Sequence, residues 1–300
     1  MIKTIHLSST KELDNRVIAI GDLHGDYKLT LDCLKLAKVI DDNLKWIAKP
    51  KNTVVIQVGD QVDRCRPNLN EDCGDKEITK NDESDIRVLE YFEELHKKAK
   101  QKGGAVYSLI GNHEIMNVQG DIRYVSYEGR KEFGGDEGRR KAFEAGQGWA
   151  KRMACTRPAV LVIGSTVFAH AGILPKLAKK YTPKQVNQAV KNYLLNDYSQ
   201  EDKEIVENRK ISPFWTRINS SESDMSCGMA RQSLRTWNVG RMIVGHTPQI
   251  DKEGANAICK GRVWRIDVGS SKAFDPFVQH ENRIQVLEIL NDGQKVRVLR

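Results

Sequence analysis

Short apolar runs alternate with stretches of helical periodicity in the first third of the chain. Residues 16–20 and 53–58 are rich in β-branched side chains and are predicted to form buried strands. Between them, residues 27–39 place leucine, alanine and valine at helical spacing, which predicts a helix packed on a sheet. A strand, a helix and a second strand in this order indicate a parallel βαβ unit.

The same alternation continues towards the end of the chain. Residues 85–102 predict a helix that ends at Gly103-Gly104, and residues 105–110 predict a third strand. Further elements are expected as strands at 159–163, 166–169, 241–244, 263–268, 284–290 and 295–299, and as helices at 182–196 and 229–239. No repeat, low-complexity linker or clear domain boundary interrupts the pattern, so we expect a single α/β domain over residues 1–300.

Three stretches lack strand patterning. Residues 65–84 are polar and rich in Asn and Asp, which predicts an inserted surface loop. Residues 120–157 are predicted to form a helical cap, and residues 198–228 a mostly polar loop around Phe214-Trp215-Thr216-Arg217. These three stretches are therefore expected to lie outside the predicted strands.

The composition is that of an ordinary globular chain, with 39% hydrophobic and 29% charged residues. No apolar run approaches the roughly 20 residues that a membrane helix needs. Residues 1–6 lack the apolar stretch and small-residue cleavage site of a secretory signal. We therefore expect a cytoplasmic protein with no membrane partner.

The net charge of +8 favours acidic or phosphorylated partners and leaves non-specific nucleic-acid binding open. Residues 71–94 are acid-rich, so the positive charge is unevenly spread. The basic segment contains Arg123, Arg130, Lys131, Arg139, Arg140, Lys141, Lys151, Arg152 and Arg157. This segment forms either a set of solvated helical faces or a substrate-facing surface.

Six cysteines are too few and too scattered for a disulfide scaffold in a chain of this length, so reduced thiols are expected. The absence of a C-x-x-C pair argues against a zinc-thiolate site. Cys65 and Cys73 are the exception, because they lie close together beside Asp60 and Arg64. If they join under oxidation, the loop would be pinned and turnover would change with redox state.

Polar side chains stand beside a glycine at the end of five strand-like runs. They supply three carboxylates, one amide and four imidazoles: Asp22, Asp60, Asp63, Asn112, His24, His113, His170 and His246. Small-molecule and metal sites are built at the carboxyl edge of such sheets. One histidine after a strand is usually structural, as we expect for His6, His96 and His280. Four of seven histidines at strand ends, however, favour a shared site.

The chemistry of this residue set is that of a metal centre. Oxygen and nitrogen ligands without thiolate suit manganese, iron or zinc ions. One carboxylate can bridge two ions, which activate water for direct attack on phosphorus. Arginine matches the charge that develops on the phosphoryl oxygens, and a histidine oriented by a carboxylate can protonate the leaving group.

The motifs, taken together and in order, resemble those of calcineurin-like metallophosphoesterases. These are Asp22-x-His24, Gly59-Asp60-x-x-Asp63-Arg64, Gly111-Asn112-His113-Glu114, His170 and Gly245-His246. The Asp63-Arg64 pair narrows the resemblance to the phosphoprotein phosphatase superfamily. Asn112 to Asn117, with Gly120-Asp121-x-Arg123-Tyr124, is similar to the Shewanella-like protein phosphatases. The resemblance implies a four-layer αββα fold with two mixed β-sheets flanked by helices.

The resemblance also implies roles for individual residues. Asp22, His24 and Asp60 would hold a first ion, and Asp60 would bridge to a second ion held by Asn112, His170 and His246. His113, oriented by Asp63, would donate a proton, and Arg64 would bind the phosphate. A second phosphate-binding arginine is expected between His170 and His246; Arg217 is chosen, although spacing alone leaves Arg231 and Arg235 open.

Two departures from the family pattern are visible. Cys65 stands where the family usually has glycine, and a long insertion with Cys73 follows it. The Ser-Ala-Pro-Asn-Tyr-Cys segment of eukaryotic Ser/Thr phosphatases is replaced by Val268-Gly269-Ser270-Ser271. This second departure argues against the toxin-sensitive eukaryotic type and leaves the preference between phosphoserine/threonine and phosphotyrosine open.

We therefore expect a phosphoprotein phosphatase that uses two divalent ions, manganese first and iron or zinc as alternatives. Its partner would be a phosphorylated protein or peptide, with nucleic acid and membrane not expected; the oligomeric state is left open. The alternative enzyme is a small-molecule phosphohydrolase such as a diadenosine tetraphosphatase. The alternative from another class is a catalytically idle phosphate- or nucleic-acid-binding module.

Overall fold

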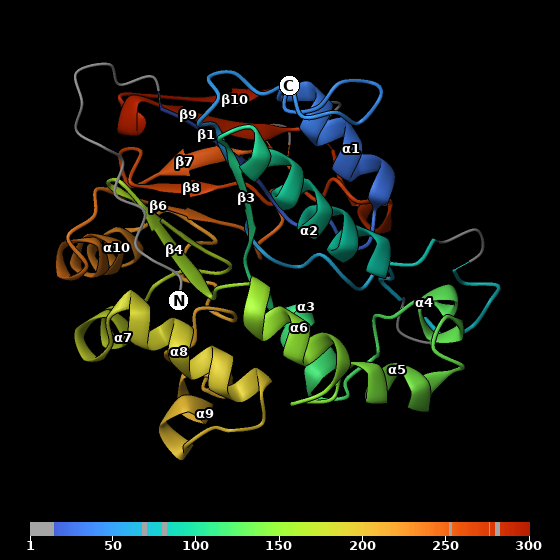
Figure 1. Cartoon of the computed structure of the whole chain (residues 1–300). Coiled ribbons are helices and arrows are strands. Elements are labelled where there is room, and N and C mark those ends of the chain that lie inside the picture. Colours follow the sequence, from blue (N-terminus) through green and yellow to red (C-terminus); the bar gives the residue numbers. More distant parts are fainter. Residues whose placement is uncertain (1–14, 68–70, 80–82, 252–253, 276, 280–282) are drawn as a thin grey trace.

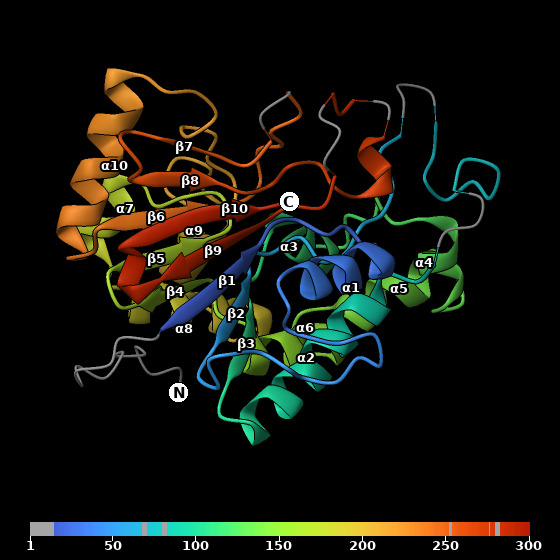
Figure 2. The same cartoon turned by 90° about the horizontal axis from the view of Figure 1, so that it is seen from above.

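The computed structural model describes residues 15–67, 71–79, 83–251, 254–275, 277–279 and 283–300. His6, His280 and parts of the expected insertion 65–84 lie outside the described residues. Two five-stranded sheets form the centre of the molecule, and helices flank them on both sides (Figures 1 and 2). Among the described residues, no helix combines the length and apolar character needed to cross a membrane.

The first sheet has the strand order β10-β9-β1-β2-β3. Its strands are β1 (Arg16–Ile20), β2 (Val54–Gln57), β3 (Ala105–Ser108), β9 (Val286–Leu290) and β10 (Lys295–Leu299). Strands β1, β2 and β3 run parallel, and helices α1 (Tyr27–Leu36) and α2 (Ile86–Gln101) connect them. The predicted βαβ unit is therefore present, while β9 pairs antiparallel with both β1 and β10.

The second sheet has the order β4-β5-β6-β8-β7. Its strands are β4 (Val160–Ile163), β5 (Thr166–Ala169), β6 (Arg241–Val244), β7 (Asn256–Ile258) and β8 (Val263–Arg265). Strands β5, β6 and β8 are parallel, so their carboxyl ends share one edge. The short strand β7, which has only one buried residue, was not predicted.

The two sheets pack face to face through apolar side chains that both contribute. Val17 and Ile56 from the first sheet lie in one cluster with Phe168 and Ile243 from the second. Helices α1 and α2 pack on the outer face of the first sheet. Helices α7 (Pro175–Lys180), α8 (Pro183–Leu194) and α10 (Asp224–Thr236) pack outside the second sheet. The expected four-layer fold is confirmed.

The segment expected to form a cap contains three short helices. These are α4 (Tyr127–Lys131), α5 (Asp136–Phe143) and α6 (Gly148–Thr156), and they follow α3 (Asn112–Val118). The expected polar loop at 198–228 is wrong in part, because α9 (Gln200–Glu207) and the start of α10 lie in it. Both helices begin at a serine whose side chain accepts a backbone N–H, a local signal that outweighs the polar composition.

Four of the six cysteines form disulfides, so the expectation of reduced thiols is wrong for Cys227 and Cys259, while Cys65 and Cys73 are the pair that the sequence set apart. Cys65 bonds Cys73, and Cys227 on α10 bonds Cys259 just after β7. Cys33 and Cys155 carry free thiols. The second bond joins residues 32 positions apart, and only the packing of α10 against the second sheet brings them together.

The basic segment at 123–157 is largely neutralised by carboxylates. Arg139 is fully buried against Asp85, and the buried Arg157 pairs with Glu93. Other ion pairs are Arg123–Asp121, Arg130–Asp72, Lys131–Glu128, Arg140–Glu137 and Arg152–Glu93. Several of these pairs join the segment to residues outside it, and the interpretation as a substrate-facing basic surface is left mainly with Arg123, which lines a cavity together with His113.

Candidate metal centre

The eight polar residues predicted at strand ends lie at the carboxyl edges of the two sheets. Asp22 and His24 follow β1, Asp60 and Asp63 follow β2, and the α3 residues Asn112 and His113 follow β3. From the second sheet, His170 follows β5 and His246 follows β6. All eight side chains are buried. Residues up to 224 positions apart in sequence are thereby brought to one place.

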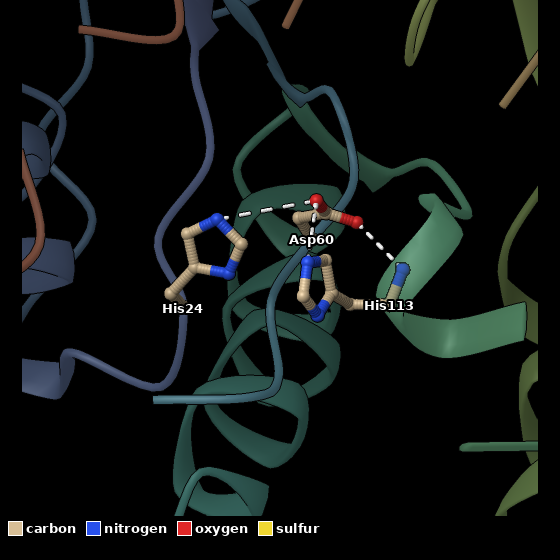
Figure 3. A group of neighbouring side chains, drawn as sticks. All are labelled: His24, Asp60 and His113. Carbon is tan, nitrogen blue, oxygen red and sulfur yellow. Dashed lines mark hydrogen bonds and ion pairs between the residues drawn. The ribbon is translucent and has the colours of Figure 1, made fainter. Parts of the chain in front are cut away.

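Asp60 is the centre of this group. One oxygen, Oδ2, lies 3.3 Å from Nε2 of His170, 3.8 Å from Nε2 of His113 and 3.9 Å from Nε2 of His24. Figure 3 shows the rings of His24 and His113 on two sides of this carboxylate. A single carboxylate that faces imidazoles on several sides has the arrangement needed to bridge two cations.

Two groups of potential ligands share Asp60. The first contains His24, Asp60 and His113, and the second contains Asp60, His170 and His246. Within each group the candidate ligand atoms lie within 4.8 Å of one another. Asn112 adjoins the second group, since its Oδ1 lies 2.8 Å from Nε2 of His170.

Two buried polar atoms in the centre have no hydrogen-bond partner among the described residues. They are Oδ1 of Asp22 and Nε2 of His246. The other oxygen of Asp22 accepts a bond from the backbone N–H of His246 at 3.0 Å, so these two residues lie side by side. Because buried polar groups are rarely left unpaired, each of these two atoms fits a contact to a cation.

The acidic residues of the centre affect one another's protonation. Burial works to raise the pKa of Asp60, but the imidazoles of His170, His113 and His24 together hold it well below its ordinary value. Burial and the neighbouring Asp267 and Asp60 raise the pKa of Asp22 well above its ordinary value. Burial raises the pKa of Asp267 to about 6. Because neighbouring negative charges disfavour one another, cations bound between these carboxyl groups would favour their ionised forms.

Asp267 was not predicted as a site residue. It follows β8, and its Oδ1 accepts a bond from the backbone N–H of Gly269 at 3.0 Å. The signal was present in the sequence, because Asp267 ends an apolar run and stands two residues before Gly269. It was missed because the glycine comes after the acid, whereas in most of the other motifs it comes before.

Four residues of the centre adopt left-handed backbone conformations. The φ angles are 44° at His24, 55° at Asp60, 69° at Asp63 and 67° at His246. Such conformations are uncommon for residues other than glycine and persist only where the surroundings impose them. The loops of the centre are therefore held in place by contacts outside the ligands themselves.

Glu114 supplies many of these contacts. Its Oε2 accepts bonds from the backbone N–H groups of Asp60 at 3.0 Å and Gly111 at 2.7 Å. Its Oε1 accepts from Gln61 at 2.7 Å and Val62 at 3.3 Å. This fully buried carboxylate therefore fixes the loop that carries Asp60. The sequence marked Glu114 only as part of a motif, with no role.

His113 and Asp63 form a hydrogen-bonded pair. Nδ1 of His113 lies 2.7 Å from Oδ2 of Asp63, and Nε2 faces Asp60. Because an ionised carboxylate only accepts hydrogen bonds, the proton of the ring belongs on Nδ1 in this pair. The arrangement leaves Nε2 directed at the centre, where a proton can be taken up or given.

The two arginines expected at the phosphate contact loops that carry candidate ligands. Arg64 is buried and donates from Nη1 to the carbonyl oxygen of Gly25 at 3.3 Å. Arg217 is exposed and donates to the carbonyl oxygen of His246 at 3.1 Å. It lines a cavity of about 460 Å³ whose other walls include Asn112 and His113. The alternatives Arg231 and Arg235 are exposed on helix α10 and do not line this cavity.

A third arginine at the centre, Arg66, was not predicted. Its Nη2 lies 2.7 Å and 2.8 Å from the two ring nitrogens of His24. Its guanidinium carbon lies 4.8 Å from the ring centre of Phe274 and 5.2 Å from that of Tyr124. The adjacent disulfide at Cys65 tethers the loop that carries it. The only signal for Arg66 in the sequence was its position two residues after Arg64.

Comparisons with known proteins agree with this geometry. Residues 15–249 match the family model described as calcineurin-like phosphoesterase. An uncharacterised protein of Acanthamoeba polyphaga mimivirus is 40% identical over 240 residues, which cover 67% of this chain and 95% of that protein. Shewanella-like protein phosphatase 2 of Arabidopsis thaliana is 30% identical over 332 aligned residues, covering 96% of this chain and 78% of that protein.

A solved structure of similar fold is that of a cold-active protein tyrosine phosphatase. It superposes with a TM-score of 0.72 at 22% identity, covering 96% of this chain and 79% of that one. At this identity the likeness concerns the fold alone. That phosphatase therefore has the same arrangement of two sheets with flanking helices.

Proposed function

The chain belongs to the calcineurin-like phosphoesterase family, and from this premise we propose that it is a dinuclear metal-dependent protein phosphatase. Its substrates would be phosphomonoesters on serine/threonine or tyrosine side chains of proteins. The single observation that carries the proposal is the position of Asp60, one carboxylate shared by two groups of buried ligands. The relatives named as protein phosphatases support the substrate class.

In this proposal, Asp22, His24 and Asp60 hold one divalent ion. Asp60, Asn112, His170 and His246 hold the other. The unpaired Oδ1 of Asp22 supports its place at the first ion, where the group found in the structure contains His113 instead of Asp22. The unpaired Nε2 of His246 supports its place at the second ion. When bound, such ions polarise the phosphoryl group and lower the pKa of coordinated water, which supplies the nucleophile. Manganese is the first candidate, with iron and zinc as alternatives, because the ligands are oxygen and nitrogen.

The side chains around the ions complete the reaction. His113 would donate the proton on Nε2 to the oxygen of the leaving serine, threonine or tyrosine, and Asp63 would keep the ring in the required orientation. Arg64 and Arg217 would bind the phosphoryl oxygens, whose negative charge a planar guanidinium matches. The 2.7 Å contact between His113 and Asp63 supports the first of these roles.

The proposal is tested by measuring hydrolysis of p-nitrophenyl phosphate and phosphopeptides with added manganese, before and after chelation. We expect activity that disappears on chelation and returns with metal. Metal analysis of protein purified without added ions would report which ions are bound and how many. Turnover that persists after the metal has been stripped would refute the dinuclear mechanism.

One observation supports a second candidate function. The cavity beside His113 is lined by Arg123, Arg209, Tyr124 and Trp215, which also suit a nucleotide polyphosphate. A small-molecule phosphohydrolase such as a diadenosine tetraphosphatase would use the same metal centre. Side-by-side kinetics with diadenosine tetraphosphate and phosphopeptides decide between the two. A large preference for the dinucleotide would reverse the ranking.

Cytoplasmic localisation stays a prediction. Disulfides persist mainly in oxidising compartments, and four cysteines of this chain are paired. The redox state of these cysteines in the cell, measured by thiol labelling of rapidly quenched extracts, bears directly on the prediction. Reduced thiols at all four positions would agree with the cytoplasm, whereas intact bonds would argue for another compartment.

A further inference from the structure

Arg139, on helix α5 of the cap, is the largest fully buried side chain among the described residues. Its two terminal nitrogens donate to the two oxygens of Asp85 at 2.8 Å and 2.9 Å. Its Nε donates to Oδ1 of Asn117 at 2.9 Å. The guanidinium carbon lies 4.3 Å from the ring centre of Phe143. A fully buried arginine with this many fixed contacts has one orientation.

The partners of Arg139 are also the partners of Asp63. Nδ2 of Asn117 donates to Oδ1 of Asp63 at 2.8 Å. Oδ2 of Asp85 accepts from the backbone N–H of Asp63 at 3.0 Å. The remaining oxygen of Asp63, Oδ2, faces Nδ1 of His113 at 2.7 Å. A continuous hydrogen-bonded path therefore runs from the cap to the histidine.

The direction of each bond along this path follows from donor and acceptor chemistry. Arginine can only donate, so it turns the oxygen of the Asn117 amide towards itself. The amide nitrogen must then point at Asp63, which as a carboxylate can only accept. The left-handed backbone of Asp63, with φ of 69°, needs such outside support. Arg139 thus contacts both Asn117, which holds the side chain of Asp63, and Asp85, which holds its backbone.

We propose that Arg139 is a positioning residue that orients His113 for proton donation, acting through Asp85, Asn117 and Asp63. This inference rests on the function proposed above. It makes the cap a part of the catalytic apparatus, since a residue of α5 would set the geometry of a histidine on α3. Outer contacts of this kind typically change activity by roughly 10- to 100-fold when they are removed.

A purely structural role for Arg139 makes a different prediction. If Arg139 only ties the cap to the sheets, its loss would slow the hydrolysis of all substrates alike. If it orients the proton donor, the loss would depend on the leaving group. A serine alkoxide needs a proton as it departs, whereas 2,4-dinitrophenolate is a weak base and departs without one.

The experiment compares kcat/KM for a phosphoserine peptide and for 2,4-dinitrophenyl phosphate. For Arg139→Met we expect a roughly 10- to 100-fold loss with the peptide and little change with the dinitrophenyl ester. Arg140→Met is the matched control, because Arg140 follows on the same helix and pairs with Glu137 at the surface. It should behave like wild type with both substrates.

A second variant is needed in case Arg139→Met does not fold. Removal of Arg139 leaves Asp85 buried without its partner, which can unfold the chain. Asn117→Leu keeps the ion pair between Arg139 and Asp85 and removes the amide bonds to Arg139, to Asp63 and to the carbonyl oxygen of His113. We expect the same leaving-group dependence from it. An equal loss with both substrates, in either folded variant, would overturn the inference.

A spectroscopic readout separates this inference from the proposed function. The Nδ1–H proton of His113, held by Asp63, should give a low-field NMR resonance in wild type and in Arg140→Met. Its loss or upfield shift in Arg139→Met supports the inference even if no substrate is hydrolysed. An unchanged resonance contradicts it. Failure of wild type to hydrolyse either ester would instead reject the proposed function.

Discussion

The two sheets contribute to the metal centre in different ways. Ligands of the first sheet lie on loops that buried carboxylates hold by their backbone N–H groups, as Glu114 holds the loop of Asp60. On the second sheet, His170 follows β5 directly and His246 follows β6 after Gly245, and the contacts of both reach across to the first sheet. Nδ1 of His170 lies 3.0 Å from the carbonyl oxygen of Val58, and the backbone of His246 donates to Asp22.

The contacts between the sheets run in both directions, because His246 of the second sheet also holds the carboxylate of Asp22 on the first. Glu114, however, holds the loop of Asp60, the carboxylate that both groups of ligands share. Damage to the supports of the first sheet should therefore disturb both candidate ion positions. A substitution in the second sheet should disturb only the nearby ion position or lower the free energy of unfolding.

The largest effect is expected in the first half, at the proton donor. His113→Asn should reduce turnover of a phosphoserine peptide by roughly 10²- to 10⁴-fold, as for a lost general acid. The metal content, measured by inductively coupled plasma mass spectrometry, should stay near that of wild type because the other ligands remain. A fall in metal content that accounts for the lost turnover would instead make His113 a ligand.

The next largest effect is expected in the second half and concerns stability. Replacement of both Cys227 and Cys259 by serine should lower the free energy of unfolding by about 3–4 kcal/mol, since their bond closes a loop of 32 residues. Denaturant unfolding measures this change. Cys155→Ser, which alters an exposed free thiol, is the control and should leave the unfolding free energy unchanged. An unaltered double variant would show that the bond contributes nothing.

Glu114→Gln tests the dependence between the two halves directly. The amide presents one oxygen and an NH2 group to backbone N–H donors, so some of these donors lose their acceptor. We expect metal affinity, measured by calorimetry, to fall roughly 10- to 100-fold at both candidate positions. His246→Ala should lose a single ion. Loss of one ion from both variants would mean that the halves are independent.

The smallest effect is expected from the bond between Cys65 and Cys73. This bond tethers the loop of Arg66, which lies beside His24. Reduction should loosen the loop and change the KM for phosphopeptide by a small factor, with turnover at saturation less affected. Kinetics of the Cys65→Ser/Cys73→Ser variant, with and without reductant, separate this bond from the other disulfide. Equal activity in reductant and oxidant would remove any regulatory role.

Local sequence patterns were sufficient for most of the strands and for the places of the candidate ligands at strand ends. An apolar run followed by glycine and a polar residue marks a strand end, and this signal involves only neighbouring positions. It placed Asp22, Asp60 and His246 on the correct loops. The short strand β7 and helix α9 were missed, because each has few buried residues and thus a weak pattern.

The sequence by itself determined the order of strands and helices along the chain, the types of ligand available and their places at strand ends. Only the tertiary structure decided which distant side chains meet. It buried Arg139, which belongs to a basic segment expected at the surface, and paired it with Asp85. It also joined Cys227 to Cys259. The physical reason is that these contacts depend on how the two sheets and the cap pack together, and no local periodicity encodes the distance between segments far apart in the chain.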